Sequence, residues 1–339
     1  MYQFMAFKIA CYGVHDYEVP FFKKLNKYDY DLKLITAFLT HDNVEEIKGC
    51  DAVLLRGNCI ADAQNLAKMN DYGIKYVFTR TIGYDHIDLQ AAAGYGMKVA
   101  RVPGYSAYSV AELALTLGMM LFRHTTYATS RTAQGNYQVT PTYFSKEAHS
   151  STIGIIGTGH IGVTEAELWK GMGATVLGYD VFQSDAAKQV VDFVSLDELV
   201  EKSDIISLHV PYFPGQNDKM INADLIAKIQ PHTILVNTAR GELVDYDAVL
   251  AALKGNRLDG FASDVLLEEG QVFGKDLGSN DQLPLPVLRD LAKLYPKVLF
   301  TPHMGSLTEP ALEGMISVSY DNFHTTLTTG KVPNEVTAK

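Results

Sequence analysis

Short apolar runs alternate with amphipathic stretches along the whole chain. The stretches at 61–72, 161–172, 195–202, 222–229 and 245–254 repeat apolar residues at helical spacing. The apolar runs between them have the near-continuous character of parallel strands covered on both faces. These runs are 7–13, 31–37, 51–57, 75–80 and 97–101, then 152–157, 174–180, 204–209, 233–238, 260–265 and 297–301. The alternation predicts an α/β fold with two doubly wound parallel sheets.

Two longer helical segments divide this pattern into domains. Residues 107–129 have the pattern of one long helix and separate the two series of strands, while residues 308–329 form a second such segment that ends at Gly330. We therefore expect a discontinuous first domain, residues 1–104 and 304–339. The second domain, residues 105–303, is inserted into it. A length of 339 residues fits two domains in one chain.

Composition and charge narrow the possible partners and compartment. The formal charge of −10 disfavours binding to nucleic acid or to an anionic membrane surface. The longest apolar stretch, 109–122, contains Glu112 and is too short to span a bilayer, and the N-terminus lacks a signal-peptide pattern. The three cysteines form no C-x-x-C pair, so neither a disulfide framework nor a metal site is indicated. We expect a cytoplasmic protein.

A glycine motif follows the first strand of the second series. Gly157-Thr-Gly159-His160-Ile161-Gly162 begins at the last residue of the apolar run 152–157 and opens a helical pattern. In this context the glycines allow a tight turn, close approach to a pyrophosphate and close helix packing, and the helix N-terminus favours the phosphates. Asp180 ends the next strand, where a carboxylate binds the ribose hydroxyls and repels a 2′-phosphate. The pattern predicts an NAD site.

Three further strands end in residues suited to chemistry on a polar carbonyl. Arg240 follows strand 233–238, Glu268 and Glu269 follow strand 260–265, and His303 follows strand 297–301. Ligands of doubly wound sheets bind beyond the carboxyl ends of the strands. Hydride transfer between a nicotinamide and a 2-oxo acid needs an imidazole for the proton, a carboxylate to orient it and a guanidinium for the substrate carboxylate. We expect Arg240, Glu269 and His303 to be catalytic.

These motifs, in this order, resemble the D-2-hydroxyacid dehydrogenase family. They are Gly157-x-Gly159-x-x-Gly162 with Asp180, the segment 236–245 with Arg240, Asp264-Val265 followed by Glu269, and Thr301-Pro302-His303. The resemblance extends from about residue 7 to 335. It implies a Rossmann NAD domain inserted into a flavodoxin-like catalytic domain, with Arg240 on the substrate, His303 as acid/base and Glu269 as its partner.

The resemblance also implies roles for further residues. Main-chain N–H groups of Ile82 and Gly83 would receive the substrate carboxylate, Tyr105 would line the substrate site, and Asp264 would contact the nicotinamide amide. His86 lies in the same loop as Ile82 and has either a site role or a loop-holding one. We expect the coenzyme site to comprise Gly157, Gly159, His160, Ile161, Gly162, Asp180, His209, Val210, Pro211, Thr238, Ala239 and Asp264.

Arg56 bears on the choice of substrate. It ends the third strand of the first domain, at a position that lines the side-chain pocket in the D-lactate dehydrogenase branch. A guanidinium there would select a second carboxylate, although a lone arginine is also commonly an ion-pair partner. Together with the motifs T-R-T-x-G-x-D-H-I-D and V-F-G-K-D-L, it resembles the (R)-2-hydroxyglutarate dehydrogenases of glutamate-fermenting anaerobes. That resemblance implies reversible reduction of 2-oxoglutarate to (R)-2-hydroxyglutarate.

Two alternatives remain open at this point. One is the same chemistry on a monocarboxylate, as in D-lactate or D-2-hydroxyisocaproate dehydrogenase. The other is an NAD(H)-sensing binding protein, since corepressors of this fold keep the catalytic residues. The family usually forms homodimers, and the run Met119-Met120-Leu121-Phe122 would serve either as a dimer surface or as core packing.

Overall fold

The computed structural model describes residues 6–338, which form two compact units. Unit 1 takes residues up to Ser106 and from Leu307, and unit 2 is Ala107–Ser306. The expected boundaries were 104/105 and 303/304. The chain passes from one unit to the other slightly later than these boundaries, because helix α4 begins at Ala107 and the loop that carries His303 belongs to unit 2.

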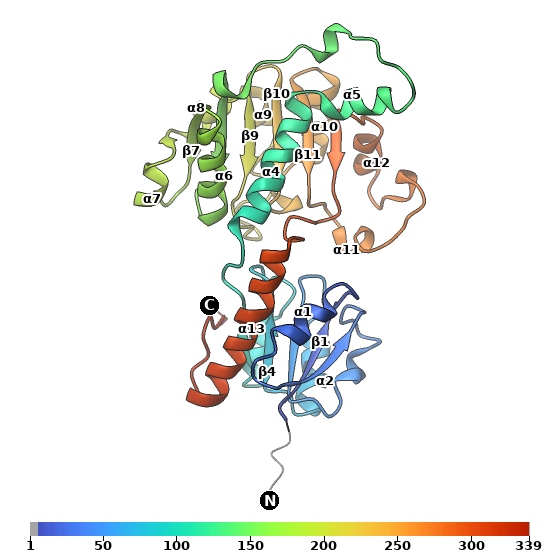
Figure 1. Cartoon of the computed structure of the whole chain (residues 1–339), viewed down its shortest axis with the longest axis vertical. Coiled ribbons are helices and arrows are strands. Elements are labelled where there is room, and N and C mark those ends of the chain that lie inside the picture. The colour runs from blue at the N-terminus through green and yellow to red at the C-terminus, as the bar shows by residue number, and fades with distance from the viewer. Residues whose placement is uncertain (1–5, 339) are drawn as a thin grey trace, which may run out of the picture. The chain divides into compact units, whose positions relative to one another are not determined.

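Unit 1 contains a five-stranded parallel sheet in the order β2-β1-β3-β4-β5, the flavodoxin-like order (Figure 1). Its strands are β1 (Lys8–Tyr12), β2 (Asp31–Ile35), β3 (Ala52–Leu55), β4 (Tyr76–Thr79) and β5 (Lys98–Ala100). The register aligns Ala52 with Tyr76 and Leu55 with Thr79. Arg56 and Arg80 therefore leave neighbouring strands at the same edge of the sheet.

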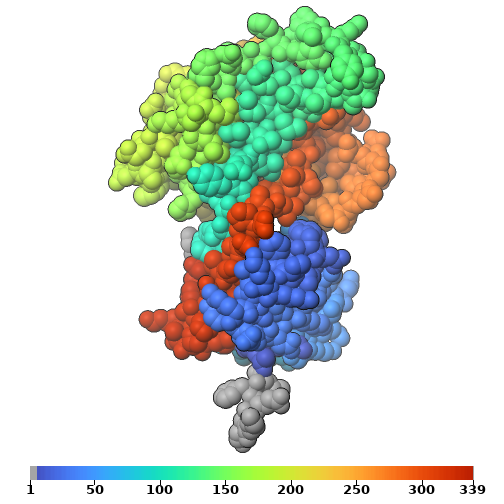
Figure 2. All heavy atoms as spheres, viewed as in Figure 1, coloured from blue at the N-terminus to red at the C-terminus, as the bar shows by residue number. Residues whose placement is uncertain are grey.

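Helices cover both faces of this sheet. They are α1 (Val19–Lys24), η1 (Val44–Ile47), α2 (Ala63–Asp71), α3 (Leu89–Gly94) and α13 (Glu309–Thr329). One core packs α2, α3 and η1 against the sheet, and the other places Ile316, Tyr320 and Phe323 of α13 against it. Figure 2 shows α13 lying against the N-terminal part of the same unit. The C-terminal helix therefore completes the domain that the N-terminus begins.

Unit 2 is built on a seven-stranded parallel sheet in the order β12-β11-β10-β9-β6-β7-β8 (Figure 1). This is the Rossmann order with one extra strand. The strands are β6 (Thr152–Ile156), β7 (Thr175–Tyr179), β8 (Asp192–Phe193), β9 (Ile205–Leu208), β10 (Thr233–Asn237), β11 (Leu258–Ser263) and β12 (Val298–Phe300). The short edge strand β8 was not expected from the sequence, because two residues carry no periodic pattern.

Helices cover the two faces of this sheet as well. On one face α4 (Ala107–Phe122) and α6 (His160–Gly171) pack together over the sheet. The other core contains residues of α8 (Leu196–Lys202), α9 (Ala223–Lys228), α10 (Tyr246–Lys254) and α12 (Pro286–Ala292). Smaller elements are α5 (Thr125–Thr132), η2 (Pro141–Tyr143), η3 (Ala148–Ser150), α7 (Asp185–Lys188), η4 (Gly241–Leu243), α11 (Glu269–Val272) and η5 (Asn280–Gln282).

The expected single helix over 107–129 is wrong. The chain forms α4 and α5, and His124 between them adopts a left-handed conformation with φ of 50°. The break follows from packing: Leu121 and Phe122 are buried, whereas Arg123 just beyond them is exposed. The helical pattern of the sequence continues through this point, but the core against which α4 packs ends there.

Candidate active site and coenzyme site

The glycine loop joins β6 to α6 at the carboxyl edge of the unit 2 sheet. Gly157 has φ of 95°, and a Cβ there would lie 2.7 Å from the main-chain carbon of His209. A Cβ on Gly162 would collide with the carbonyl oxygen of Gly157. These two positions therefore require glycine for the turn and for the close approach of α6.

The middle glycine leaves space for a ligand. No atom lies within 4 Å of the position that a Cβ on Gly159 would take, and α6 begins at His160 directly after it. The first N–H groups of a helix lack helical partners and attract anions. The loop therefore fits a pyrophosphate that approaches the backbone at Gly159.

Two groups near this loop fit the rest of a dinucleotide. The Asp180 carboxylate accepts hydrogen bonds from the main-chain N–H groups of Thr158 (2.7 Å) and Phe182 (2.9 Å), which fix it at the end of β7. Thr238 follows β10, and among the described residues its buried Oγ1 has no hydrogen-bond partner. A buried hydroxyl without a partner is costly, so a bound ligand that bonded to it would stabilise the site. These residues fit NAD.

The imidazole of His303 is held by Glu269. Nδ1 of His303 lies 3.0 Å from Oε1 of Glu269, and the two side chains are 36% and 30% exposed. His303 has φ of 55°, a conformation that few residues other than glycine adopt. The Glu269 contact occupies Nδ1 and leaves Nε2 as the nitrogen for proton exchange. The neighbouring Glu268 is exposed and bonds to Gln271 instead.

Asp264 holds the loop that presents His303. Its carboxylate accepts hydrogen bonds from Thr301 Oγ1 (2.6 Å), the N–H of Met304 (2.9 Å) and the N–H of Gly305 (2.8 Å). The residue is 2% exposed. Both oxygens of Asp264 therefore accept hydrogen bonds from the loop that carries His303. The contact of Asp264 with the nicotinamide amide stays a prediction.

Arg240 follows β10, the strand next to β11. Asn237 fixes this turn by donating to the carbonyl oxygen of Arg240 (2.8 Å) and accepting from the N–H of Ala239 (3.0 Å). A Cβ on Gly241 would lie 2.5 Å from the main-chain carbon of Leu266, so this turn packs directly on the chain that leads to Glu269. Arg240, Glu269 and His303 thus follow three adjacent parallel strands and lie at one edge of the sheet.

Unit 1 holds the other expected substrate residues. Thr81 Oγ1 donates to the carbonyl oxygen of Gly83 (2.7 Å), and Arg101 donates to that of Ile82 (3.0 Å), so both peptide groups of this loop are fixed. The main chain of Tyr105 packs against Gly314 of α13. A Cβ added to Gly314 would lie 3.1 Å from the Cβ of Tyr105. These residues belong to the same unit as Arg56.

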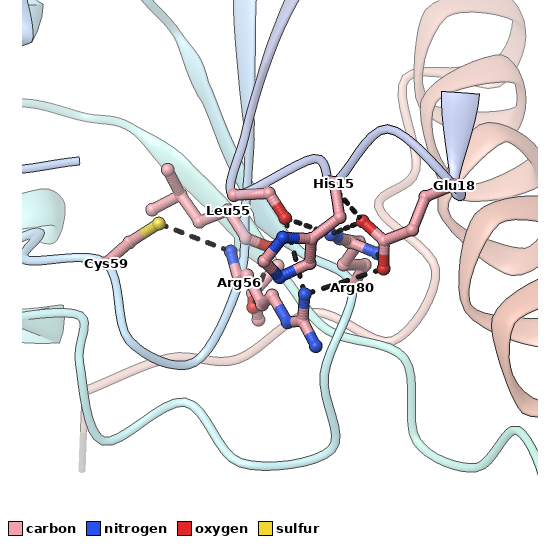
Figure 3. A network of polar contacts seen from close by, with 8 residues as sticks. His15, Glu18, Leu55, Arg56, Cys59 and Arg80 are labelled. Carbon is pink, nitrogen blue, oxygen red and sulfur yellow. Dashed lines mark hydrogen bonds and ion pairs between the residues drawn. The ribbon is translucent and has the colours of Figure 1, made fainter. Parts of the chain in front are cut away.

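Arg56 lies beside a buried ion pair that the sequence did not reveal (Figure 3). Arg80 binds Glu18 through two hydrogen bonds, of 2.9 and 3.1 Å, and both side chains are at most 2% exposed. Arg56 reaches the same carboxylate only at 3.5 Å, and its side chain is 19% exposed. Two guanidinium groups therefore share one carboxylate, which leaves a positive charge at Arg56.

The titratable groups of this cluster respond to that excess of positive charge. Burial alone would raise the pKa of Glu18, but the hydrogen bond and charge of Arg80, with the charge of Arg56, lower it overall. Burial lowers the pKa of His15, and the charge of Arg56 lowers it further. Figure 3 shows His15 beside the two arginines. The cluster is an environment that favours an anion.

The glycine loop, the Asp180 carboxylate and the oriented imidazole together fit an NAD-dependent oxidoreductase. The profile of the family described as "D-isomer specific 2-hydroxyacid dehydrogenase, NAD binding domain" matches residues 115–305. D-lactate dehydrogenase of Lactiplantibacillus plantarum is 35% identical over 332 residues, which are 97% of this chain and 99% of that protein. The chain therefore belongs to the D-isomer specific 2-hydroxyacid dehydrogenase family.

Solved structures agree with this assignment. D-2-hydroxyisocaproate dehydrogenase matches with a TM-score of 0.86 and 34% identity, covering 98% of this chain and 100% of that one. D-lactate dehydrogenase of Lactobacillus jensenii, solved with NAD+, matches with a TM-score of 0.84 and 33% identity over the same shares. The expected fold and coenzyme are thereby confirmed, and the protein is an enzyme rather than a coenzyme sensor.

No helix within residues 6–338 has the length and apolar character needed to cross a bilayer. Leu121 and Phe122 belong to the core of unit 2, so for these two residues of the run 119–122 the core-packing alternative holds. Large apolar side chains are exposed instead at Tyr137, Val139 and Phe144, in the segment between α5 and β6.

Proposed function

We propose that this dehydrogenase reduces 2-oxoglutarate to (R)-2-hydroxyglutarate, reversibly, with NADH. The observation that carries the choice of substrate is the shared carboxylate of Glu18. Arg80 takes both of its oxygens, whereas Arg56 bonds to one of them at 3.5 Å and keeps part of its guanidinium exposed. A planar guanidinium with an unmatched charge favours a second carboxylate and disfavours a methyl or isobutyl group.

In this proposal the residues that the family resemblance implies act on the 2-oxo acid. Arg240 and the main-chain N–H groups of Ile82 and Gly83 bind the carboxylate next to the carbonyl group. Tyr105 lines the substrate site, and Arg56 binds the distal carboxylate. These contacts hold the carbonyl carbon in one orientation, which lowers the entropic cost of the reaction.

His303 then acts as the proton donor. Glu269 accepts from Nδ1, so the proton on Nε2 is directed at the carbonyl oxygen of the substrate, which becomes the hydroxyl group. NADH, when bound, supplies the hydride that reduces the carbonyl carbon. In the reverse direction the neutral imidazole accepts the hydroxyl proton, and Glu269 stabilises the imidazolium that forms.

The coenzyme would be held by residues of unit 2. The glycine loop and the N-terminus of α6, with His160 and Ile161, would hold the pyrophosphate, and Asp180 the adenosine ribose. His209, Val210 and Pro211 would line the adenosine side, and Thr238, Ala239 and Asp264 the nicotinamide side. The free Oγ1 of Thr238 and the open space at Gly159 support this arrangement.

The names of the relatives favour a different substrate. They include D-lactate and D-2-hydroxyisocaproate dehydrogenases, which points to pyruvate or a branched 2-oxo acid at least as strongly as Arg56 points to 2-oxoglutarate. In that alternative the same catalytic residues act on a monocarboxylate. Arg56 is then an ion-pair partner of Glu18 and not a substrate ligand.

Steady-state kinetics separate the two candidates. We expect kcat/KM for 2-oxoglutarate to exceed that for pyruvate, 2-oxoisocaproate and phenylpyruvate by roughly tenfold or more, the effect of one charge-assisted contact. Arg56→Leu should lower kcat/KM for 2-oxoglutarate and spare pyruvate. Arg123→Leu, which removes an exposed arginine of unit 2, is the control. A preference for pyruvate in the unaltered enzyme would establish the alternative.

We also propose that the enzyme is a cytoplasmic homodimer. Cys11, Cys50 and Cys59 are buried free thiols, as suits a reducing compartment. Phe144 is 92% exposed and Val139 87%, so this segment of unit 2 would gain from burial against a second copy. Light scattering coupled to size-exclusion chromatography tests the proposal, with Val139→Asp/Phe144→Asp expected to give monomers.

A further inference from the structure

Glu165 is a buried carboxylate behind the glycine loop that the proposed mechanism does not use. It lies on α6 and is 0% exposed. Oε1 accepts a hydrogen bond from Nε1 of Trp169 at 2.9 Å, and Oε2 lies 2.5 Å from Nε2 of His209. A buried carboxylate is costly unless both oxygens are paired, so this arrangement needs a reason beyond filling space.

His209, the residue that Glu165 contacts, directly follows β9, and its main chain touches the glycine loop. Its side chain turns inward, is 1% exposed, and also lies 3.2 Å from Ser207 Oγ. Its main-chain N–H donates to the carbonyl oxygen of Ile156 at 2.7 Å. On the other side, the main chain of His209 and Val210 packs so closely on Gly157 that no Cβ fits between them.

We propose that Glu165 is a positioning residue of the coenzyme site. By binding the imidazole of His209, it holds residues 209–210 against Gly157 and thereby fixes the shape of the loop that receives the pyrophosphate. Because Glu165 lies on the same helix whose N-terminus faces the phosphates, the contact joins the two sides of the nucleotide site, α6 and the end of β9. A carboxylate accepts hydrogen bonds only, so Nε2 of His209 carries the proton.

Plain core packing is the competing explanation, and it makes a different prediction. A residue that only fills the core affects the free energy of unfolding but not the affinity for NADH. A positioning residue changes the affinity, because the loop must then be ordered when the coenzyme binds. The chemical step is not affected, since His303 and Glu269 follow strands on the far side of β9 and β10 in the sheet.

The test is the dissociation constant of NADH, measured by isothermal titration calorimetry on the full chain. We expect Glu165→Leu to raise the Kd about tenfold, the effect of one hydrogen bond to a charged group. At saturating NADH, kcat and the KM for the 2-oxo acid should stay within about twofold of the unaltered enzyme. Glu165→Gln, whose amide oxygen can accept from Trp169 and whose amide nitrogen can donate to Nε2 of His209 in the tautomer protonated at Nδ1, should restore the Kd. An unchanged Kd in Glu165→Leu overturns the proposal.

Trp169→Phe is the matched control. It removes the other hydrogen bond of the same carboxylate, on the side away from the glycine loop, and should lower the melting temperature without raising the Kd. If Glu165→Leu does not fold, Glu165→Asp replaces it, because the shortened side chain withdraws from His209 but keeps the charge. Trp169 is the chain's one tryptophan, so its emission reports whether the core around Glu165 is intact. A Kd raised equally by Trp169→Phe, or unchanged in a folded Glu165→Asp, contradicts the proposal.

Discussion

Nδ1 of His303 lies 3.0 Å from Oε1 of Glu269, although 34 residues separate the two in the sequence. The contact exists because β11 and β12 are neighbours and run in the same direction, so the segments that follow them meet. It fixes the orientation of the imidazole and leaves Nε2 as the nitrogen that would meet the substrate. The first two predictions concern this pair.

His303→Ala should lower kcat by roughly 10²–10⁴, the usual contribution of a general acid. The Kd of NADH should change less than twofold, because His303 follows β12 and the glycine loop follows β6, four strands further along the sheet order. Stopped-flow kinetics and calorimetry measure the two quantities. His232→Ala is the control, since this exposed histidine of the same unit also pairs with a carboxylate, Asp259, away from the site. Retention of kcat in His303→Ala would remove the residue from its assigned role.

Glu269→Gln should move the pH profile of 2-oxo acid reduction toward lower pH. Reduction requires the protonated imidazole, and loss of a negative charge in contact with it destabilises that form. The rate should therefore begin to fall at a lower pH than in the unaltered enzyme. Glu268→Gln serves as the comparison, because Glu268 is adjacent but bonds to Gln271. If Glu268→Gln shifts the pH profile and Glu269→Gln does not, Glu268 and not Glu269 is the partner of His303.

Gly159→Ala should weaken NADH binding while leaving the fold intact. The position has open space around it, so a methyl group meets no protein atom and the melting temperature should stay within a few degrees. The same methyl group occupies the space into which the pyrophosphate would come, and we expect the Kd to rise about tenfold or more. Gly171→Ala on the same helix also meets open space and should leave the Kd unchanged. Equal affinities in both variants would contradict the pyrophosphate position.

Glu18→Gln should destabilise unit 1 by about 3–5 kcal/mol at neutral pH, because it leaves the buried Arg80 without a countercharge. The pKa of Glu18 is lowered in the folded protein, so its stabilising effect is present above the pKa of an unfolded glutamate, about 4.3, and is lost as the pH falls further. The difference in melting temperature between variant and parent should therefore shrink below about pH 4. Glu46→Gln, at an exposed ion pair, should show little difference at any pH. A gap that persists at low pH would mean that the charge of Glu18 is not responsible.

The sequence predicted the parts of the site that follow directly from strand order. Gly157, Arg240, Glu269 and His303 each come just after an apolar run, and parallel strands bring their carboxyl ends to one edge. The apolar runs were enough to place them at this edge, and the choice of Glu269 over Glu268 came from the family resemblance. The break at His124 was not predictable, because it depends on where the core under α4 ends and not on local helix propensity.

The sequence could not reveal contacts that depend on burial. Glu18 and Arg80 are 62 residues apart, and Glu165 and His209 are 44 apart, and neither pair lies in a recognisable spacing. In a sequence Glu18, Arg80 and Glu165 look like surface charges. Only the packing around them shows that they are buried and paired.

The discontinuity of unit 1 sets an order of events during synthesis. Unit 2 is a continuous segment that ends at Ser306, so its translation is complete before α13 is made. The sheet of unit 1 is translated before unit 2 but lacks Ile316, Tyr320 and Phe323, which cover one of its faces, until α13 has been made after unit 2. Of the two units, the one whose translation begins first is therefore the last to acquire its complete core, and its exposed apolar face is the one that chaperones would have to protect.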